Sequence, residues 1–354
     1  MGAQLNARQR WLPFLDAAMT LTRIQVRHIL VLLGGTLLFC LCLPAVSAAP
    51  QIRKQAPGFF HMMIGSYEIT ALSDGTKAIP WNTLAHNAAP GEVEALTKKA
   101  FLTEPVENSS AAYLVNTGKV LILIDTGAGQ MWDATLGKVV INLRASGYRP
   151  DQVDEVLITH LHFDHAGGLV DNGRAVFPNA TIWVDKKEVD FWLGKKARTS
   201  APDALKPWFD KAAAALAPYQ AAGRLKTFSG AKSFAPGIYA IETFGHTPGD
   251  ASYAIESDGQ KLVVWGDLVH FAAVQFADPS VTIAFDIDEK GNAEQRKAAM
   301  HDAVIGGYYT ASSHVSFPGI GHVGAEGDHY VFVPVNYITI FPPQVVAGSL
   351  PNPR

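Results

Sequence analysis

Cysteine is almost absent from this chain of 354 residues. Only Cys40 and Cys42 occur, and both lie within the first 48 residues. Disulfide bonds are therefore excluded from the rest of the chain, which must be stabilised by burying apolar side chains. Any metal ion bound there must take imidazole and carboxylate ligands, since no thiolate is available.

An excess of positive charge is also lacking. The chain has 29 Lys and Arg residues against 32 Asp and Glu residues, which gives a net charge of -3. This excludes the basic footprint that nucleic-acid binding requires. With 48% hydrophobic residues, 17% charged residues and no internal repeat, the composition predicts one ordinary globular domain, which we place at residues 49–354.

A long apolar run occurs over residues 29–43, behind a short basic segment and before several small residues. About 15 uncharged residues are short for a membrane-spanning helix, which needs about 20. The run predicts a secretory signal peptide over residues 1–48, cleaved after Ala48 or Ala49. We therefore expect a periplasmic or secreted protein with no stable membrane anchor after cleavage; an uncleaved anchor is the alternative.

Beyond residue 58, short apolar strands alternate with amphipathic helices, which indicates an α/β fold. We predict strands at 67–72, 112–115, 120–124, 155–159, 238–242, 251–255, 262–266, 309–313 and 330–334, and helices at 134–146, 186–193 and 292–305. Ser73-Asp74-Gly75 is predicted to be a turn. Residues 195–236 have the weakest pattern and are predicted to be an insertion over the functional site.

The most informative feature is a group of polar residues in a run that begins at Thr159 and ends at Gly168. Seven candidate metal ligands are His160, His162, Asp164 and His165 within this run, and His246, Asp267 and His322 further along. Strand periodicity does not produce four such residues within six, because a core strand alternates its side chains and buries apolar ones. The run is typical of a loop wrapped around cations.

The ligand types indicate the chemistry. Imidazole and carboxylate suit zinc or a similar divalent ion, with manganese, cobalt or iron as alternatives according to supply. Seven ligands predict two ions, one bridging carboxylate and an open position for water. Between ions about 3.5–4 Å apart, a shared water loses a proton near neutral pH and becomes the nucleophile. A non-catalytic metal-binding protein is a weaker alternative, because structural zinc sites are closed.

The assembled pattern resembles the metallo-beta-lactamase superfamily, through HxHxDH at 160–165, Gly245-His-Thr-Pro-Gly249, Gly266-Asp267 and a late His. The resemblance implies a four-layer αβ/βα sandwich in a single domain. It assigns one metal to His160, His162 and His246, and the other to Asp164, His165 and His322, with Asp267 bridging both. It also implies that Asp125 orients a ligand His.

The last ligand has competitors in His314 and His329. His322 is preferred because it follows the glycine-containing turn Pro318–Gly321, which lets the backbone approach a metal. His314 is then predicted to lie at a strand end or behind a ligand. We attach no function to Asp250.

Nearly all of the chain after the signal peptide resembles methyl parathion hydrolases and their relatives, exported bacterial enzymes that cleave phosphotriesters and, in related members, lactones and aryl esters. The matching runs are Glu68–Thr76, Ala272–Phe276, Asp278–Val281 and Ser313–His322. The resemblance implies an aromatic leaving-group pocket formed by Trp132, Trp192 and Phe209 or its neighbour Trp208. For each of these residues a purely structural role in the core is the alternative.

The sequence departs from the phosphotriesterase pattern around this pocket. The departures are His270 near Asp267, Leu84 in place of Arg, and Ile283 and Phe285 in place of smaller or polar residues. They predict a tighter pocket that suits a planar substrate better than a tetrahedral phosphotriester. We therefore expect a hydrolase of small neutral lactones or aryl esters that attacks with a metal-bridging hydroxide and has side activity on organophosphate triesters.

Two other activities stay open on the same centre: a main activity on phosphotriesters, and hydrolysis of a beta-lactam or thioester. The substrate pocket, and not the metal chemistry, decides among them. The sequence leaves the oligomeric state open, with a homodimer as one option.

Overall fold

The computed structural model describes residues 49–339 and residue 341. The predicted signal peptide at residues 1–48 lies outside the described residues. The chain divides into two units, Met1–Lys54 and Gln55–Arg354, and the described part of the first contains no helix or strand. Within the described part of the chain, no helix has both the length and the apolar character that crossing a bilayer requires.

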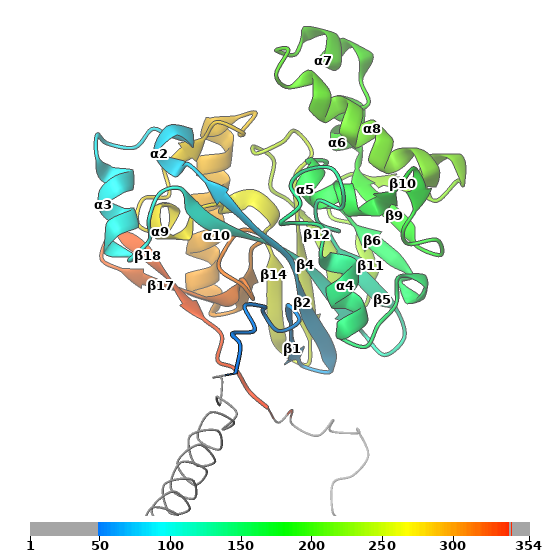
Figure 1. The fold of residues 1–354 in the computed structure, drawn as a ribbon, viewed down its shortest axis with the longest axis horizontal. Helices are drawn as coiled ribbons and strands as arrows, with labels where there is room; N and C mark the ends of the chain where they lie inside the picture. Colours follow the sequence, from blue (N-terminus) through cyan, green and yellow to red (C-terminus); the bar gives the residue numbers. More distant parts are fainter. Residues whose placement is uncertain (1–48, 340, 342–354) are drawn as a thin grey trace, which may run out of the picture. The chain divides into compact units, whose positions relative to one another are not determined.

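Two sheets of seven strands form the centre of the second unit (Figure 1). The first sheet consists, in spatial order, of β1 (Phe59–Ile64), β2 (Tyr67–Ile79), β4 (Val106–Asn116), β5 (Leu121–Ile124), β6 (Glu155–Leu157), β9 (Thr181–Asp185) and β10 (Leu225–Phe228). The second consists of β11 (Ser233–Ala235), β12 (Ile238–Glu242), β13 (Ala251–Ser257), β14 (Gln260–Val264), β16 (Tyr309–Ala311), β17 (Ile320–Glu326) and β18 (His329–Pro334). Two short pairs are β3 (Ala85–His86) with β15 (Thr282–Ile283), and β7 (Val170–Asp171) with β8 (Arg174–Ala175).

Strand β4 shows how the sequence builds the layers. Because successive side chains of a strand point to opposite faces, Tyr113 and Val115 enter the core between the two sheets, while Ala112 and Leu114 enter a second core on the outer face. These residues are almost completely buried. Burying a side chain such as that of Leu114 contributes about 1.5–3 kcal/mol.

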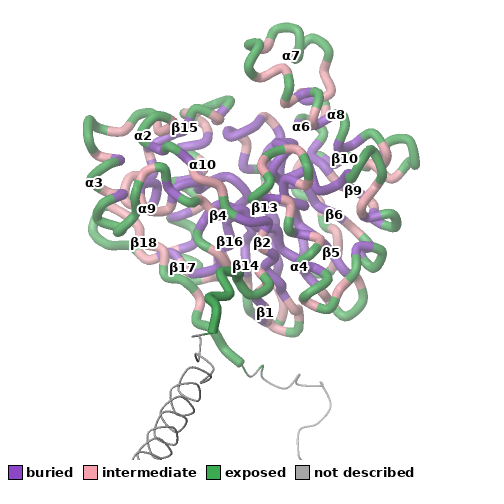
Figure 2. Tube along the Cα trace, viewed as in Figure 1, coloured by how far each residue is buried: buried purple, intermediate pink, exposed green. Residues whose placement is uncertain are grey.

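Helices cover the outer faces of both sheets. The α-helices of the described residues are α2 (Trp81–Leu84), α3 (Glu92–Lys99), α4 (Val139–Ala145), α5 (Phe163–Ala166), α6 (Lys186–Trp192), α7 (Lys195–Ser200), α8 (Lys206–Ala221), α9 (Ala272–Gln275) and α10 (Glu289–Gly306). Side chains of α4, α6 and α8 share a core with the first sheet, and Met300 and Ala303 of α10 share one with the second. The predicted four-layer sandwich is therefore confirmed. Figure 2 shows the buried residues concentrated in the strands, whereas α7 has no buried residue.

Two predictions of local structure were wrong. Strand β2 does not turn at residues 73–75 but continues through an irregular register there. Asp74 is buried and accepts the N–H groups of Ala128 and Val139, so this segment fastens the next loop to the sheet. The predicted insertion at residues 195–236 is integral to the fold, because after α7 and α8 it supplies one edge strand to each sheet, β10 and β11.

Candidate metal centre

The candidate ligands lie in loops that follow strands of both sheets. His160, His162, Asp164 and His165 follow β6, His246 follows β12, Asp267 follows β14, and His314 follows β16. All are buried, with at most 9% of their surface exposed. The fold therefore gathers side chains from two sheets at one point, as is common for sites built on loops of a rigid scaffold.

The ligand atoms form two groups that share one carboxylate. The first ligand group consists of His160, His162 and His246, whose ligand atoms and one carboxylate oxygen of Asp267 all lie within 4.8 Å of one another. The second ligand group consists of Asp164, His165 and His314, whose ligand atoms also lie within 4.8 Å of one another. Oδ2 of Asp267 is 3.5 Å from Nε2 of His160 and 3.3 Å from Nε2 of His246. Oδ1 is 3.1 Å from Nε2 of His165 and 3.3 Å from Nε2 of His314. One oxygen of Asp267 thus faces each group.

Outer hydrogen bonds orient four of the five rings. The partners of Nδ1 are Thr159 Oγ1 for His160 (3.1 Å), Asp125 Oδ2 for His165 (2.8 Å), Asp286 Oδ1 for His246 (2.8 Å) and the carbonyl oxygen of Ser109 for His314 (2.9 Å). These contacts leave Nε2 of each ring directed inward, which is how protein metal sites commonly fix their imidazole ligands. Asp125 contacts His165 as the sequence predicted.

The residues fit two divalent metal ions. Nε2 of His160, Nε2 of His165 and Oδ1 of Asp267 are buried and have no hydrogen-bond partner among the described residues; the last two are close but are not aligned for a hydrogen bond. A buried polar atom without a partner is costly, and an ion between the two ligand groups would satisfy these atoms. Nδ1 of His162 also lies 2.9 Å from Nε2 of His246, a pair of ring nitrogens that a shared cation would hold together.

Electrostatics favour cations at the same place. Burial lowers the pKa of His160 and His162 well below its usual range, which keeps both rings neutral and able to act as ligands. Burial would also lower the pKa of His246 and His314, but nearby carboxylates outweigh it and raise each pKa to about 10. The carboxylates responsible are Asp267 for both rings, Asp286 for His246 and Asp164 for His314. They stabilise positive charge at the centre.

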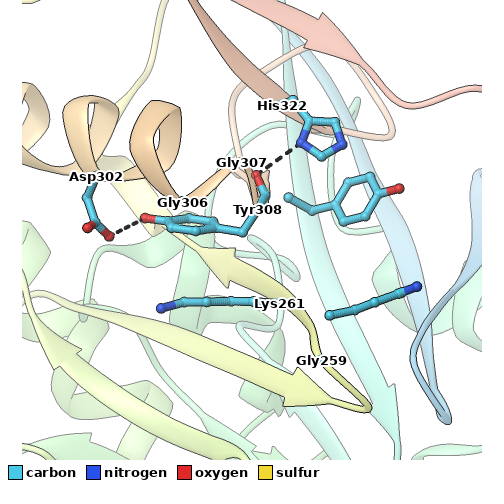
Figure 3. A pocket seen from close by; sticks show the side chains of 9 residues that line it. Gly259, Lys261, Asp302, Gly306, Gly307, Tyr308 and His322 are labelled. Atoms are coloured by element: carbon cyan, nitrogen blue, oxygen red, sulfur yellow. Dashed lines mark hydrogen bonds between the residues drawn. The ribbon is translucent and has the colours of Figure 1, made fainter.

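The prediction that His322 completes the second ligand group is wrong, and His314 takes this place. His322 is the third residue of β17 and lies beside Tyr309, where β16 begins, whereas the ligands gather where β16 ends. Its Nδ1 contacts the carbonyl oxygen of Tyr308 at 3.2 Å, in a separate hollow that Lys261 and Asp302 also line (Figure 3). His314 Nε2 is 3.4 Å from Oδ2 of Asp164. His329 lies in β18, outside both ligand groups.

A small cavity of about 60 Å³ opens onto the metal ligands. Four of the residues predicted to bind substrate line it: Trp132, His270, Phe285 and Trp208, the alternative to Phe209. Residues that the sequence did not indicate also line it, namely Ile79, Trp81, Asn108 and Phe163. They come from β2, β4 and the starts of α2 and α5, and no motif marks them.

The other predicted pocket residues lie in the core. Trp192 and Phe209 are each 1% exposed and pack against each other, with ring centroids 4.7 Å apart. Leu84 packs in a cluster around Trp81 and does not line the cavity. Trp192 nevertheless contacts one of the ligands, because its ring packs edge-on against the His162 ring with the two centroids 5.3 Å apart.

His270 lines the cavity and also contacts the shared carboxylate of Asp267 directly. Its Nε2 is 2.9 Å from Oδ2 of Asp267, and it forms a further potential ligand group with Asp267 and His314. Burial lowers the pKa of His270 to about 4, against the opposing effect of Asp267, so the ring is neutral at neutral pH. Asp250 is fully buried, its side-chain oxygens have no partner among the described residues, and burial raises its pKa well above the usual range.

Comparison with known proteins identifies the family of this chain. The family model of the metallo-beta-lactamase superfamily matches residues 106–329. An N-acyl homoserine lactonase of Bacillus thuringiensis is 26% identical over 211 residues, which cover 54% of this chain and 74% of the relative. The fold, the ligand pattern and this match together show that the chain belongs to the metallo-beta-lactamase superfamily.

Two solved structures resemble most of the chain. Hydrolase AbOPH of the beta-lactamase superfamily is 39% identical with a TM-score of 0.77, covering 81% of this chain and 100% of its own. AidC, a dizinc quorum-quenching lactonase in complex with a homoserine product, is 26% identical with a TM-score of 0.74, covering 80% and 99%. The protein is a lactonase-like, metal-dependent hydrolase of this superfamily.

Proposed function

We propose that this protein hydrolyses small neutral lactones or aryl esters at a pair of zinc ions shared by Asp267. The observation that carries the proposal is the position of that carboxylate, with one oxygen facing each ligand group. The similarity to a dizinc lactonase supports zinc as the metal. Two such ions, when bound, supply an activated water and polarise the oxygen of the bond to be cleaved.

The chain's own residues position and enclose the reaction. Asp267 keeps the two ligand groups together, and outer contacts such as that of Asp125 prevent the imidazole rings from rotating. The cavity wall is mainly aromatic, so it excludes bulk water from the reacting bond. Among the residues lining this cavity there is no Lys or Arg, which favours a neutral substrate.

The narrow aromatic cavity supports a flat substrate. At about 60 Å³ it is far smaller than the roughly 300–1,000 Å³ of common ligand pockets. Trp132 and Trp208 each contact Phe163 edge-on, so the rings form a narrow wall on which a planar group can stack. A flat group matches such a wall better than a tetrahedral phosphotriester does, so we propose organophosphate hydrolysis only as a side activity.

The test is a comparison of kcat/KM on matched substrates: an aryl ester, an aromatic lactone, an acyl-homoserine lactone, a nitrophenyl phosphotriester and a cephalosporin. We expect the aryl ester or aromatic lactone to rank first and the phosphotriester well below. The Asp267→Asn variant, purified in parallel, controls for contaminating esterases. A cephalosporin or phosphotriester in first place would refute the proposal.

We also propose export from the cytoplasm to the periplasm or the medium, on the strength of the apolar run at residues 29–43. The mass of the protein recovered outside the cytoplasm identifies the residue at which the mature chain begins. A start at Ala49 or Pro50 supports cleavage by a signal peptidase. A full-length chain that remains with the membrane would contradict it.

A further inference from the structure

The buried carboxylate of Glu188 is linked to the metal centre only indirectly, through hydrogen bonds to two backbone N–H groups and to a core tryptophan. Glu188 lies in the first turn of α6 and its side chain is fully buried. Oε1 accepts the N–H of Leu161 (2.8 Å) and the indole N–H of Trp192 (2.7 Å), while Oε2 accepts the N–H of Gly249 (2.9 Å). A buried acid is retained only with such partners, because an unpaired one is costly.

Each of these partners adjoins a member of the first ligand group or belongs to the same loop as one. Leu161 lies between His160 and His162 in the chain, and the Trp192 ring packs edge-on against His162. Gly249 closes the loop that carries His246. Among the hydrogen bonds of the described residues, none joins Glu188 to the second ligand group. The contacts of Glu188 thus converge on one half of the centre.

The loop packs so closely on α6 that the contact requires glycine. A Cβ atom at Gly249 would lie 2.2 Å from the backbone nitrogen of Glu188, far inside van der Waals contact. The close approach brings the Gly249 N–H within reach of Oε2. Helix α6 therefore fastens two loops, one carrying His160 and His162 and the other carrying His246, through a single side chain.

We propose that Glu188 is a positioning residue that sets the metal affinity of the first ligand group alone. This inference rests on the proposed two-metal function. A carboxylate only accepts hydrogen bonds, so it can serve all three donors at once. The Gln side chain has the same size, but its NH2 group would face one of these donors and leave it unpaired. The loops would then be free to shift away from the metal.

The experiment measures stepwise binding of Zn²⁺ and Co²⁺ to the metal-free protein by competition with a coloured chelator. For Glu188→Gln we expect the affinity for one of the two ions to fall about 10- to 100-fold, as for other outer contacts, with the other ion unaffected. The Co²⁺ absorption bands of the weakened site should change in parallel. Asp190→Asn, an exposed position on the same helix, is the matched control and should bind as wild type does.

Background variants identify the affected half. In a His246→Ala background, which already lacks a ligand of the first group, Glu188→Gln should not weaken the remaining ion further. In a His314→Ala background it should retain its full effect on the ion that remains. The loss of kcat/KM in Glu188→Gln should be recovered as the metal concentration is raised, which a general loss of folding would not allow.

The outcomes are separable. Wild-type affinities in Glu188→Gln, or equal weakening of both ions, would overturn this inference while leaving the two-metal function intact. A wild-type chain that binds fewer than two ions would overturn both. Should Glu188→Gln fail to fold, Glu188→Asp retains the charge but withdraws the oxygens by one methylene, and it must show the same selective weakening for the inference to hold.

Discussion

Replacing the two late histidines one at a time tests the assignment of the second ligand group. Nε2 of His314 lies 3.3–3.4 Å from oxygens of Asp267 and Asp164, so His314→Ala removes one of the four donors available to one ion. Loss of an outer contact costs about 10- to 100-fold in metal affinity, and loss of a direct ligand must cost more. We expect a fall of at least about 100-fold, which corresponds to about 2.7 kcal/mol.

His322→Ala is the matched control. The ring is only partly buried and contacts Tyr309 and the Tyr308 carbonyl, away from every ligand. Its removal should change stability by no more than about 1 kcal/mol and kcat/KM by less than about twofold.

The assay combines metal content after dialysis with kcat/KM on an aryl ester at a fixed zinc concentration. Thermal unfolding of each variant checks that the comparison is between folded proteins. A His322→Ala protein that loses one ion, beside a His314→Ala protein that keeps both, would refute the assignment.

Three further variants test other parts of the centre and the fold. Asp267→Asn should lose at least one ion and lower kcat/KM by more than about 100-fold, as metal analysis and steady-state kinetics would show; unchanged turnover would rule out a shared ligand. Trp208→Ala should raise KM for an aryl ester and cost less stability than Phe209→Ala, which should cost about 3–5 kcal/mol in urea unfolding; the reverse result would contradict the cavity lining. Burial raises the pKa of Tyr219 to about 12, so its stabilisation is complete below pH 10 and lost as the pH rises through 12. The free energy of unfolding of wild type should therefore fall about 2 kcal/mol more than that of Tyr219→Phe between these pH values, and parallel curves would contradict this.

The sequence predicted the metal centre better than its surroundings. His160, His162, Asp164 and His165 lie so close in the chain that the loop alone brings them together. The choice between His314 and His322 depended on which end of β16 each residue reaches, and no local pattern contains this information. Both histidines stand near glycine-containing turns, so turn chemistry could not separate them.

Which residues line the cavity is also decided by tertiary structure and not by a local sequence pattern. Trp208 and Phe209 are neighbours on α8, and the rotation of about 100° per residue in a helix directs one toward the cavity and the other into the core. Trp81 reaches the cavity from the start of α2 and Asn108 from β4, and both lie outside the segments for which the sequence predicted a strand or a ligand. The strand and helix pattern, by contrast, was sufficient to predict an α/β fold, whereas the four layers were implied by the resemblance to the superfamily.

The most direct test of the two-metal centre is anomalous diffraction at the zinc absorption edge from crystals grown with zinc. We expect two peaks about 3.5–4 Å apart, one on each side of Asp267, with the second beside His314. A single peak, or a peak at His322 in place of His314, would contradict it.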